Sequence, residues 1–594
     1  MSRLATYFRP AVVSGAFVVA FLVAAAFAPE PAQRTGASAP AEVQRSRLRL
    51  ERLGPRPGRI VLEGLRNHPV ALGELAGRPA PVLVEKAAPV AGTRELPVPE
   101  RVARRLRAAA LRTPPSAAIE LQPGARPAEK AAGGFHSSYV ADTIDASQAT
   151  PNFRTTPPDP ILAVGPDHVV VATNRAFAVY SKQDGALLAG PIWFAFFWAD
   201  LGCFNLFDPN VLYDESADRF FVAADGAGLD YCVAASQTGD PTGDWNRYVI
   251  DVSEVDETDF FDYPQAGVGR EGIFVAANVY RGVDLFDARV IAIDKDALYD
   301  GTPLTVVNES IWPNDTPHAM HLQGWRQGTW QEEGPHYFIS NENYNGVTYA
   351  LHAWTDPFDG SGGTLVKSGV VDLEAATGVP AAYPLDAPQL GGNPVQTNDW
   401  SPFDLDWRNG LLWTTNSIAC NPGTGAVTCL RWAAIDPEDN EVVKAGVIGR
   451  ADTWFSFPNV GVDHCGNFAL GYTTHRADGY NSIEVTGRKR NDRHQNRPAF
   501  LCRAGEGTYV SYDRVPYRWG DYAEFAADPN GEDLWYVGEF TKINQTNPDF
   551  VLTKWGTALC HARFNSCRAS DGDDDDDDDD DEDEDDPGDH HGDD

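Results

Sequence analysis

Several motifs that identify common enzyme classes are missing from this chain of 594 residues. No G-x-S-x-G sequence occurs, so a Ser/His/Asp hydrolase has no support. The chain also has no C-x-x-C-H, P-loop or dinucleotide-binding glycine motif, and we expect no haem, nucleotide or flavin cofactor. Its cysteines include no C-x2-C pair, which leaves a structural zinc site poorly supported.

Aspartate is missing from the N-terminal part of the chain. Aspartate does not occur before Asp142, although the whole chain carries a formal net charge of −37. Residues 29–136 are rich in Ala, Pro and Arg, and we interpret them as a basic pro-segment or linker rather than a packed domain. Within them, VARRLRAAALR (102–112) predicts a short helix and RIVLEGLRNHPVAL (59–72) predicts one or two strands. Alternatively, this basic segment docks electrostatically on the acidic remainder.

The other end of the chain is an acidic tail, residues 569–594, in which the last 24 residues include 18 Asp and Glu. Such a segment has nothing apolar to bury and is expected to be disordered. The region between the basic segment and the tail is acidic as well. We therefore expect no nucleic-acid partner, because phosphate binding needs a basic surface.

Residues 1–28 have the pattern of an export signal, with Arg3 and Arg9 near the start and an apolar run that ends at Ala26-Phe27-Ala28. Pro29 follows directly and disfavours cleavage, so the alternative is that this segment remains as an uncleaved N-terminal anchor. We expect no other contact with a membrane. We expect a protein that is secreted, or that resides in the periplasm or cell envelope of a bacterium.

The 8 cysteines support an oxidising compartment. Pairing between nearest neighbours along the chain is the simplest interpretation. It predicts the disulfides Cys203–Cys232, Cys420–Cys429, Cys465–Cys502 and Cys560–Cys567.

A two-strand pattern repeats seven times between about residue 157 and residue 567. The repeats begin at Asp159, Asp208, Asp262, Gly328, Phe403, Phe457 and Asp521. Each repeat continues into a second hairpin with Gly, Pro or Asn at its turn, such as Asp184-Gly185. Four strands per repeat predict an all-β fold, a seven-bladed β-propeller over residues 137–568, with six or eight blades left open. We expect a strand between Tyr139 and Phe153 to join the last blade and close the ring.

Acidic residues recur where the first strand of a repeat begins. They are Asp159, Asp208, Asp262, Asp404 and Asp521. Because the first strand of each blade lines the channel of a propeller, these residues predict a rim of carboxylates, to which we add Arg518 and Glu524. A crowded rim of this kind needs a bound cation or raised pKa values, and calcium suits such oxygen ligands. The alternative is that each Asp caps a turn by accepting backbone N–H groups.

The segment PIWFAFFWADLGCFNLF (191–207) is dense in aromatic residues. One interpretation is a platform at the channel mouth that stacks on sugar rings. The other is core between blades, with a loop held by Cys203.

The segment SQTGDPTGDW (236–245) resembles the Asp-box turn of sialidase-like propellers, with Ser236, Asp240, Gly243 and Trp245 in matching roles. More broadly, the region 157–567 resembles a family of uncharacterised secreted bacterial propeller proteins. The resemblance rests on PPDPILAVGPDHVVVATNRAFAVY, FDPNVLYDESADRFF, DYPQAGVGREGIFVAANVY and RWGDYAEFAADPNGEDLWYVGEF. It implies a sialidase-like fold in which the Asp-box stabilises a turn.

Sialidases clamp a carboxylate with three arginines and use a Tyr–Glu pair with an Asp acid. The residues of this chain available for such roles are Arg175, Arg270, Arg326, Arg514, Arg518, Tyr517, Tyr522, Glu524 and Glu539. Two functions remain open. The first is a monomeric binding or scaffold module for an extracellular glycan or protein ligand. The second is a glycan-active hydrolase or lyase on a sialidase-like propeller.

Overall fold

Strands dominate the part of the chain that the structure, a computed structural model, describes. It describes residues 58–76, 78, 97–127, 135–142, 156–226, 230–252, 259–282, 284–492, 498–511, 514–543, 555–565 and 567. The expected signal segment 1–28 and acidic tail 569–594 lie outside these residues. Every described residue belongs to one compact unit that begins at residue 53. No described helix is long and apolar enough to span a membrane.

The strands form seven sheets, one for each sequence repeat. The first contains β6 (Ile161–Val164), β7 (His168–Thr173), β8 (Ala176–Ser181) and β9 (Leu187–Trp193). The second contains β10 (Leu206–Asp214), β11 (Arg219–Gly226), β12 (Asp230–Ser236) and β13 (Asp244–Asp251). The third contains β14 (Asp259–Val268), β15 (Gly272–Arg281), β16 (Asp284–Asp294) and β17 (Leu304–Ser310). The fourth contains β18 (Asp315–Ala319), β20 (His336–Asn341), β21 (Thr348–Thr355) and β22 (Thr364–Asp372).

The remaining repeats follow the same order. The fifth sheet contains β19 (His321–Leu322), β23 (Asp406–Arg408), β24 (Leu411–Cys420), β25 (Val427–Asp436) and β26 (Glu441–Gly449). The sixth contains β27 (Trp454–Val462), β28 (Phe468–His475), β29 (Ser482–Arg488) and β30 (Phe500–Arg503). The seventh contains β31 (Glu524–Ala527), β32 (Asp533–Thr541) and β33 (Trp555–Phe564). Short helices α5 (Lys295–Asp300) and α6 (Leu373–Thr377) follow β16 and β22.

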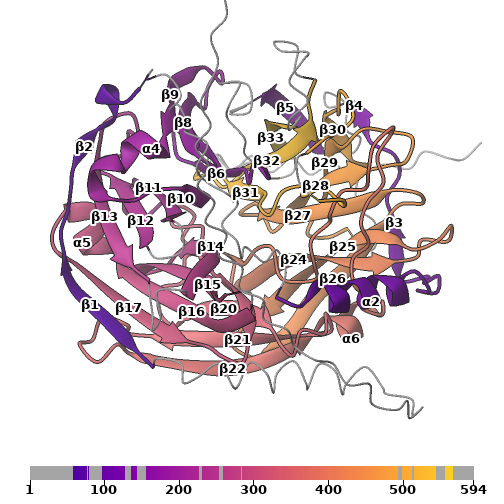
Figure 1. The fold of residues 1–594 in the computed structure, drawn as a ribbon, viewed down its shortest axis with the longest axis horizontal. Coiled ribbons are helices and arrows are strands. Elements are labelled where there is room, and N and C mark those ends of the chain that lie inside the picture. Colours follow the sequence, from indigo (N-terminus) through magenta and orange to yellow (C-terminus); the bar gives the residue numbers. More distant parts are fainter. Residues whose placement is uncertain are drawn as a thin grey trace, which may run out of the picture. The chain divides into compact units, whose positions relative to one another are not determined.

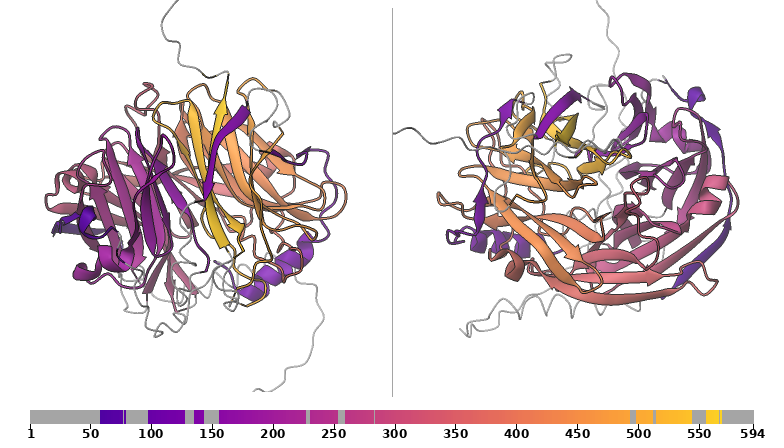
Figure 2. Two further views of the ribbon diagram at one scale, coloured as in Figure 1. Left: turned by 90° about the horizontal axis from the view of Figure 1, so that it is seen from above. Right: turned by 180° about the vertical axis from the view of Figure 1, so that it is seen from behind.

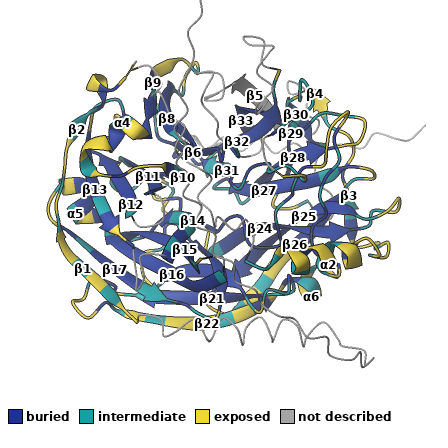
Figure 3. Ribbon diagram, viewed as in Figure 1, coloured by how far each residue is buried: buried dark blue, intermediate teal, exposed yellow. Residues whose placement is uncertain are grey.

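The first strands of successive sheets contact one another around a common centre, and the contact of β31 with β6 returns the chain to its beginning (Figure 1). The prediction of an all-β propeller is confirmed. Its second strands are almost wholly apolar, as in β15 with GIFVAANVYR, because both faces of a sheet pack against neighbouring sheets. Burial is therefore continuous through the sheets, whereas exposed residues gather at their outer edges (Figure 3).

The last sheet obtains its fourth strand from a distant part of the sequence. Strand β5 (Phe135–Asp142) pairs antiparallel with β33. The expected closing strand is confirmed, although it begins before Tyr139. This pairing covers an edge of β33 that would otherwise expose its backbone hydrogen-bonding groups.

The basic segment before β5 does not behave as a free linker in its described parts. Strands β1 (Ile60–Leu65) and β2 (Val70–Ala71) extend the third and second sheets, and β3 (Ile119–Leu121) and β4 (Arg126–Pro127) extend the fifth and sixth. Between them lie η1 (Leu72–Glu74) and α2 (Glu100–Ala110). These elements follow the periphery of the sheets (Figures 1 and 2). We call residues 58–127 the strap.

Apolar and polar contacts both hold the strap in place. Leu72 is fully buried in one hydrophobic cluster with Phe197 and Trp245. Asn67 Nδ2 donates to Asn246 Oδ1 at 2.9 Å, and Arg107 Nε lies 3.2 Å from Asp386 Oδ1. The linker interpretation failed here because composition does not reveal backbone pairing at the edge of a sheet. Electrostatic docking on the acidic remainder accounts for only some of these contacts.

Two of the predicted disulfides are confirmed and two are wrong. The structure contains Cys203–Cys232 and Cys420–Cys429 as predicted. The other bonds are Cys465–Cys567 and Cys502–Cys560, which replace the predicted pairs Cys465–Cys502 and Cys560–Cys567. Both join the sixth sheet to the seventh. These partners are 102 and 58 residues apart along the chain, but the sixth and seventh sheets pack side by side as consecutive repeats.

The aromatic segment belongs mainly to the core. Helix α4 (Phe194–Phe197) and η3 (Ala199–Leu201) follow β9, and Phe197 packs edge-on against Trp198 with ring centroids 4.7 Å apart. The alternative of core between blades is therefore the better interpretation of this segment. Phe204 is exposed and lies at its margin.

Replacing Leu72 by Ala tests whether the strap is part of the folded unit. A fully buried leucine in a packed cluster loses about 2–5 kcal/mol of unfolding free energy when truncated. We expect this loss in urea unfolding followed by tryptophan fluorescence. Leu121→Ala is the matched control, because Leu121 is 66% exposed and should change stability by less than about 0.5 kcal/mol. Equal stability of both variants would show that the strap is a detached linker.

Candidate functional site

The residues predicted for the channel rim separate into two groups. Asp159, Asp208, Asp262 and Asp521 surround Arg518, and we call these five residues the Arg518 cluster. Asp404 and Glu524 form a second group, with Asp406 as a further member that the sequence did not indicate. The predicted single ring is thus divided into two groups.

Asp159 links three repeats of the propeller. Its Oδ1 accepts the Asp521 backbone N–H at 2.7 Å, which joins the first repeat to the seventh. Its Oδ2 accepts a hydrogen bond from the Asn174 side chain, and Asn174 Oδ1 in turn accepts the Asp208 N–H at 2.7 Å. The carboxylate and the amide thus connect the seventh, first and second repeats.

Asp208 continues this connection. Its Oδ2 accepts the Tyr263 N–H at 3.3 Å from the third repeat and the Tyr522 hydroxyl at 3.2 Å from the seventh. The same hydroxyl lies 3.1 Å from the Pro264 carbonyl oxygen, and the rings of Tyr263 and Tyr522 are 5.1 Å apart. Tyr522 therefore connects the seventh repeat with the second and third repeats, next to the ring of Tyr263.

Asp404 makes an equivalent hydrogen bond between the fifth and sixth repeats. Its Oδ2 accepts the Val460 N–H of the sixth repeat at 3.4 Å. Three of the predicted aspartates therefore accept a backbone N–H from a neighbouring repeat. This arrangement corresponds to the turn-cap alternative, with the difference that the N–H belongs to another repeat rather than to the same turn.

The sequence analysis missed two features that position these residues. In five repeats a residue with a left-handed backbone precedes proline, just before the innermost strand at Asp159 and at a β-bulge within that strand at Asp208, Tyr263, Thr316 and Phe457. The aligned position of the third repeat is thus Tyr263 rather than Asp262. In four repeats an asparagine lies in the second strand or directly follows it, at Asn174, Asn278, Asn341 and Asn416.

Amide side chains repeat the connection between neighbouring sheets. Asn278 Oδ1 accepts the Thr316 N–H at 2.8 Å, as Asn174 does with Asp208. Asn459 accepts the Phe525 N–H at 2.9 Å and donates to the Ala523 carbonyl at 2.9 Å. The sequence contains a signal for both missed features. The left-handed residues are marked by X-Pro dipeptides, and the asparagines recur at similar positions of the repeats.

Burial has the largest effect on the pKa values of the aspartates in the Arg518 cluster. It raises the pKa of Asp208 to about 6, while the Arg518 charge acts in the opposite direction. Burial and then the charges of Asp521 and Asp208 raise the pKa of Asp159 well above its usual value. The pKa of Asp262 is raised by burial and then by Asp208. Protons and one arginine together offset the negative charge here.

Glu524 of the second group lines a cavity between the innermost strands of the first, second and seventh sheets. The empty space there is about 350 Å³, part of which is open solvent, and the carboxyl, imidazole and amide groups that line it belong to Glu215, His321, Gln323 and Glu524. Burial raises the pKa of Asp404 to about 8, and burial followed by the Asp404 charge raises the pKa of Glu524 well above its usual value. Burial also lowers the pKa of His321 to about 4, so this imidazole is neutral at physiological pH.

Buried polar atoms beside this cavity lack partners among the described residues. Gln323 Nε2 donates to Asp406 Oδ2 at 2.9 Å, but Gln323 Oε1 and Asp406 Oδ1 have no hydrogen-bond partner there. The fully buried Arg408 donates to Gln327, and its Nε and Nη1 have none. Such groups need water or a ligand, since each buried polar atom left unpaired costs about 1–3 kcal/mol.

The expected calcium ligands do not converge in the described residues. Three metal-binding atoms within 4.8 Å of one another occur there only at His464, Cys465 and Cys567, and both cysteines belong to one disulfide. The carboxylates of the Arg518 cluster form no such group. Calcium at the rim stays a prediction, for which the cluster offers charge but no assembled cage.

The arginines considered for a sialidase-like clamp have separate contacts. Arg518 binds Asp521 in the cluster. Arg175 Nη1 donates to the Leu206 carbonyl at 3.1 Å, and Arg270 Nη2 donates to Glu271 at 2.7 Å. Of the acids and tyrosines, Tyr522 and Glu524 face the centre. Glu539 is buried, and the charges of Asp159 and Asp521 add to the effect of burial in raising its pKa.

The segment that resembles an Asp-box is a structural turn between β12 and β13. Asp240 Oδ1 accepts the Thr242 N–H at 2.9 Å, and Trp245 Nε1 donates to the Pro241 carbonyl at 3.0 Å. Ser236 Oγ accepts the Phe220 N–H at 2.9 Å. The turn thus stabilises its hairpin.

No protein-family model and no curated protein sequence matches the chain. Among solved structures, the chain is similar to a Trypanosoma rangeli sialidase, at 10% identity and a TM-score of 0.31, over 60% of this chain and 54% of the sialidase. It is also similar to the catalytic domain of a Coprinopsis cinerea GH62 α-L-arabinofuranosidase, at 11% identity and a TM-score of 0.23, over 51% of this chain and 90% of that domain. The N-terminal domain of Nup159 matches at 8% identity and a TM-score of 0.34, over 76% of this chain and 100% of that domain. The chain thus spans about half the length of the sialidase, and its function has to be argued from its own residues.

Asp404→Asn tests the buried carboxyl through pH. Asp404 has a folded pKa of about 8 against an ordinary value of 3.8, so its stabilising contribution is complete below pH 3.8 and is lost as the pH rises through 8. The wild type should lose up to about 1.4 kcal/mol per pH unit relative to the variant between pH 5 and pH 8. Urea unfolding at pH 5, 6.5 and 8 measures this difference. The exposed Glu438→Gln variant should follow the wild type, and parallel curves for Asp404→Asn would contradict the raised pKa.

The calcium expectation is tested by thermal melting with calcium and with a chelator. If Arg518 and protons alone offset the cluster's charge, the two melting temperatures should be equal. A cation bound only to the folded state at 100 times its dissociation constant would instead stabilise it by about 2.7 kcal/mol. If calcium raises the melting temperature of the wild type but not of the variant Asp208→Asn with Asp521→Asn, the cluster is a calcium site after all.

Proposed function

We propose that this chain is an exported β-propeller that acts as a binding or scaffold module for a glycan or protein ligand, outside the cell or in the cell envelope. The observation that supports this proposal is that the central carboxylates hold neighbouring repeats together. Asp159, Asp208 and Asp404 each accept a backbone N–H from a neighbouring repeat. Groups held in this way support the fold and are poorly placed to move protons during a reaction.

The cavity lined by Glu215, His321, Gln323 and Glu524 is the proposed ligand site. Carboxyl, imidazole and amide groups suit a ligand rich in hydroxyl groups, such as the terminal sugar of a glycan, because a hydroxyl both donates and accepts. The unpaired Gln323 Oε1 and Asp406 Oδ1 beside the cavity support a polar occupant. The space is narrow, so one hydroxyl-bearing arm of the ligand enters it.

The disulfides support the proposed compartment. Four bonds use all eight cysteines of the chain. Such bonds persist in an oxidising environment, outside the cytoplasm of most organisms. The monomeric state expected from the sequence is part of the same proposal.

Glycoside hydrolysis is the second candidate, and it rests on one observation. Glu215 and Glu524 line the same cavity, and burial raises the pKa of both carboxyls. An acid with a raised pKa and a second carboxyl on the other side of a sugar are the groups that a glycosidase needs. Glu215 is however engaged, since its carboxylate accepts the Gly324 N–H at 3.1 Å.

A glycan microarray combined with a hydrolysis assay separates the two candidates. We expect the full-length protein to bind a defined set of glycans, and Glu524→Gln to weaken that binding at least tenfold by removing a cavity group. Glu438→Gln, on an exposed turn of the fifth sheet, is the control that should bind normally. Incubation with fluorogenic sialosides and α-L-arabinofuranosides should release no product.

Either of two outcomes would overturn the binding proposal. Product release that disappears in both Glu524→Gln and Glu215→Gln would establish the hydrolase. Glycan binding that is identical in the wild type and Glu524→Gln would remove the central cavity as the site.

A further inference from the structure

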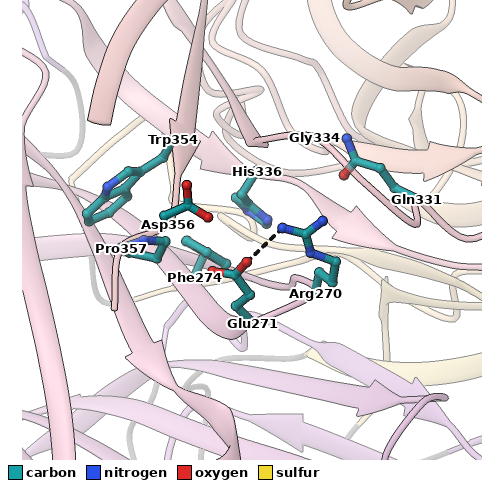
Figure 4. Close-up of a pocket in the computed structure, with 9 residues that line it drawn as sticks. All are labelled: Arg270, Glu271, Phe274, Gln331, Gly334, His336, Trp354, Asp356 and Pro357. Atoms are coloured by element: carbon teal, nitrogen blue, oxygen red, sulfur yellow. Dashed lines mark hydrogen bonds and ion pairs between the residues drawn. The ribbon is translucent and has the colours of Figure 1, made fainter. Parts of the chain in front are cut away.

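A second pocket lies away from the centre, between the third and fourth sheets. Arg270 and Glu271 form the turn between β14 and β15, His336 begins β20, and Asp356 follows β21 (Figure 4). Gln331 comes from the loop before β20. The pocket holds about 270 Å³ of empty space that is partly open to solvent. It is at the opposite end of the inner strands from the Arg518 cluster, since β14 begins near Asp262 and ends at this turn.

His336 is the unusual member of this pocket. It is only 5% exposed, and neither ring nitrogen has a hydrogen-bond partner among the described residues. The imidazole stacks on Phe274 with ring centroids 3.7 Å apart and planes inclined by 10°. Burial, followed by the charge of His321, lowers its pKa well below the usual value, so the ring is neutral.

The other polar groups leave room for a ligand beside this ring. Arg270 donates to Glu271 at 2.7 Å and to the Glu332 carbonyl at 3.0 Å, which fixes the guanidinium at the pocket's margin (Figure 4). Trp354 Nε1 is engaged with the Gly362 carbonyl at 3.0 Å. Gly269 packs closely on the stacked rings, because a Cβ there would lie 2.4 Å from Phe274 Cε2 and 2.8 Å from His336 Nδ1.

The chemistry of these groups selects one class of ligand. A neutral imidazole presents one donor and one acceptor, and a hydroxyl group complements both. Glu271 and Asp356 add acceptors, whereas Arg270 supplies the only positive charge, so the pocket disfavours an anion. A metal ion is disfavoured too, since Glu271, His336 and Asp356 do not bring three ligand atoms within 4.8 Å of one another.

We infer that the pocket around His336 is a binding site for a neutral, hydroxyl-bearing small molecule, such as a pyranose ring or a polyol. Its hydroxyl groups satisfy the two ring nitrogens of His336 and the carboxylates of Glu271 and Asp356. This site is separate from the central cavity and does not depend on the function proposed for that cavity.

The test is a titration of the full-length protein, labelled with ¹⁵N-histidine, with methyl pyranosides and with glycerol. Long-range ¹H–¹⁵N spectra report the hydrogen bonding of each ring nitrogen among the chain's 13 histidines. We expect at least one methyl pyranoside to shift the His336 signals in a saturable way. His336→Phe identifies those signals and should weaken the measured affinity at least tenfold.

Two further variants make the result decisive. Asp356→Asn keeps the left-handed backbone at this position, where φ is 51°, and should weaken binding if His336→Phe fails to fold. Glu524→Gln should leave the His336 signals and their shifts unchanged, which separates this site from the central cavity. If every pyranoside and glycerol leaves the His336 signals unchanged, the ring is satisfied by water alone and the inference is overturned. Equal binding by the wild type, His336→Phe and Asp356→Asn would overturn it as well.

Discussion

The ring depends on hydrogen bonds that cross from one repeat to the next where the innermost strands begin. A sheet of four strands satisfies its own interior backbone groups, but the N–H groups at these strand entries face the centre and need partners elsewhere. Asp159, Asn174 and Asp208 supply them through oxygens that accept N–H groups from neighbouring repeats. Water is scarce at this depth, so each such bond has to be made by the protein itself.

Using carboxylates for this purpose has an electrostatic consequence. An amide such as Asn278 makes the same bond without charge, whereas Asp159 and Asp208 bring two charges into a buried centre. The charges accumulate where the first and last repeats meet. Arg518 lies at that junction and opposes the rise in the pKa of both aspartates. The acidic centre therefore follows from closing the ring.

The sequence predicted the features that depend on local pattern. Alternating apolar strands with Asp-Gly or Gly-rich turns indicated the hairpins, and their recurrence indicated the propeller. The positions of the central aspartates were predicted less well, because the repeats were aligned by placing their aspartates at the same position. Alignment on the proline that follows each left-handed residue would have matched Asp208 with Tyr263 rather than with Asp262. It would also have exposed Asn174 and its equivalents, whose partners lie in the next repeat and cannot be recognised from one repeat alone.

Features that depend on the ring as a whole were beyond the local pattern. The cysteine pairs Cys465–Cys567 and Cys502–Cys560 each join two consecutive sheets, and pairing between nearest cysteines along the chain does not take such contacts between repeats into account. The strap was misjudged for a related reason: its apolar residues are too few for a core of their own. Leu72 and Leu75 instead complete a cluster whose other buried members come from the first two sheets and the segment that joins them. Strands β1 to β4 pair through the backbone, which any composition can do.

The strap and the central hydrogen bonds act at opposite edges of the same sheets. The innermost strands are joined through Asp and Asn side chains, and the outermost strands of four sheets are covered by β1, β2, β3 and β4. The strap thus replaces long edge strands by short ones of two to six residues, which offer few backbone groups for pairing with other proteins. Both cavities with unsatisfied polar groups lie between sheets, one at the centre beside Gln323 and one beside His336. A fold held at both edges keeps such cavities in a fixed shape, which favours recognition of a small rigid ligand over the enclosure of a flexible one.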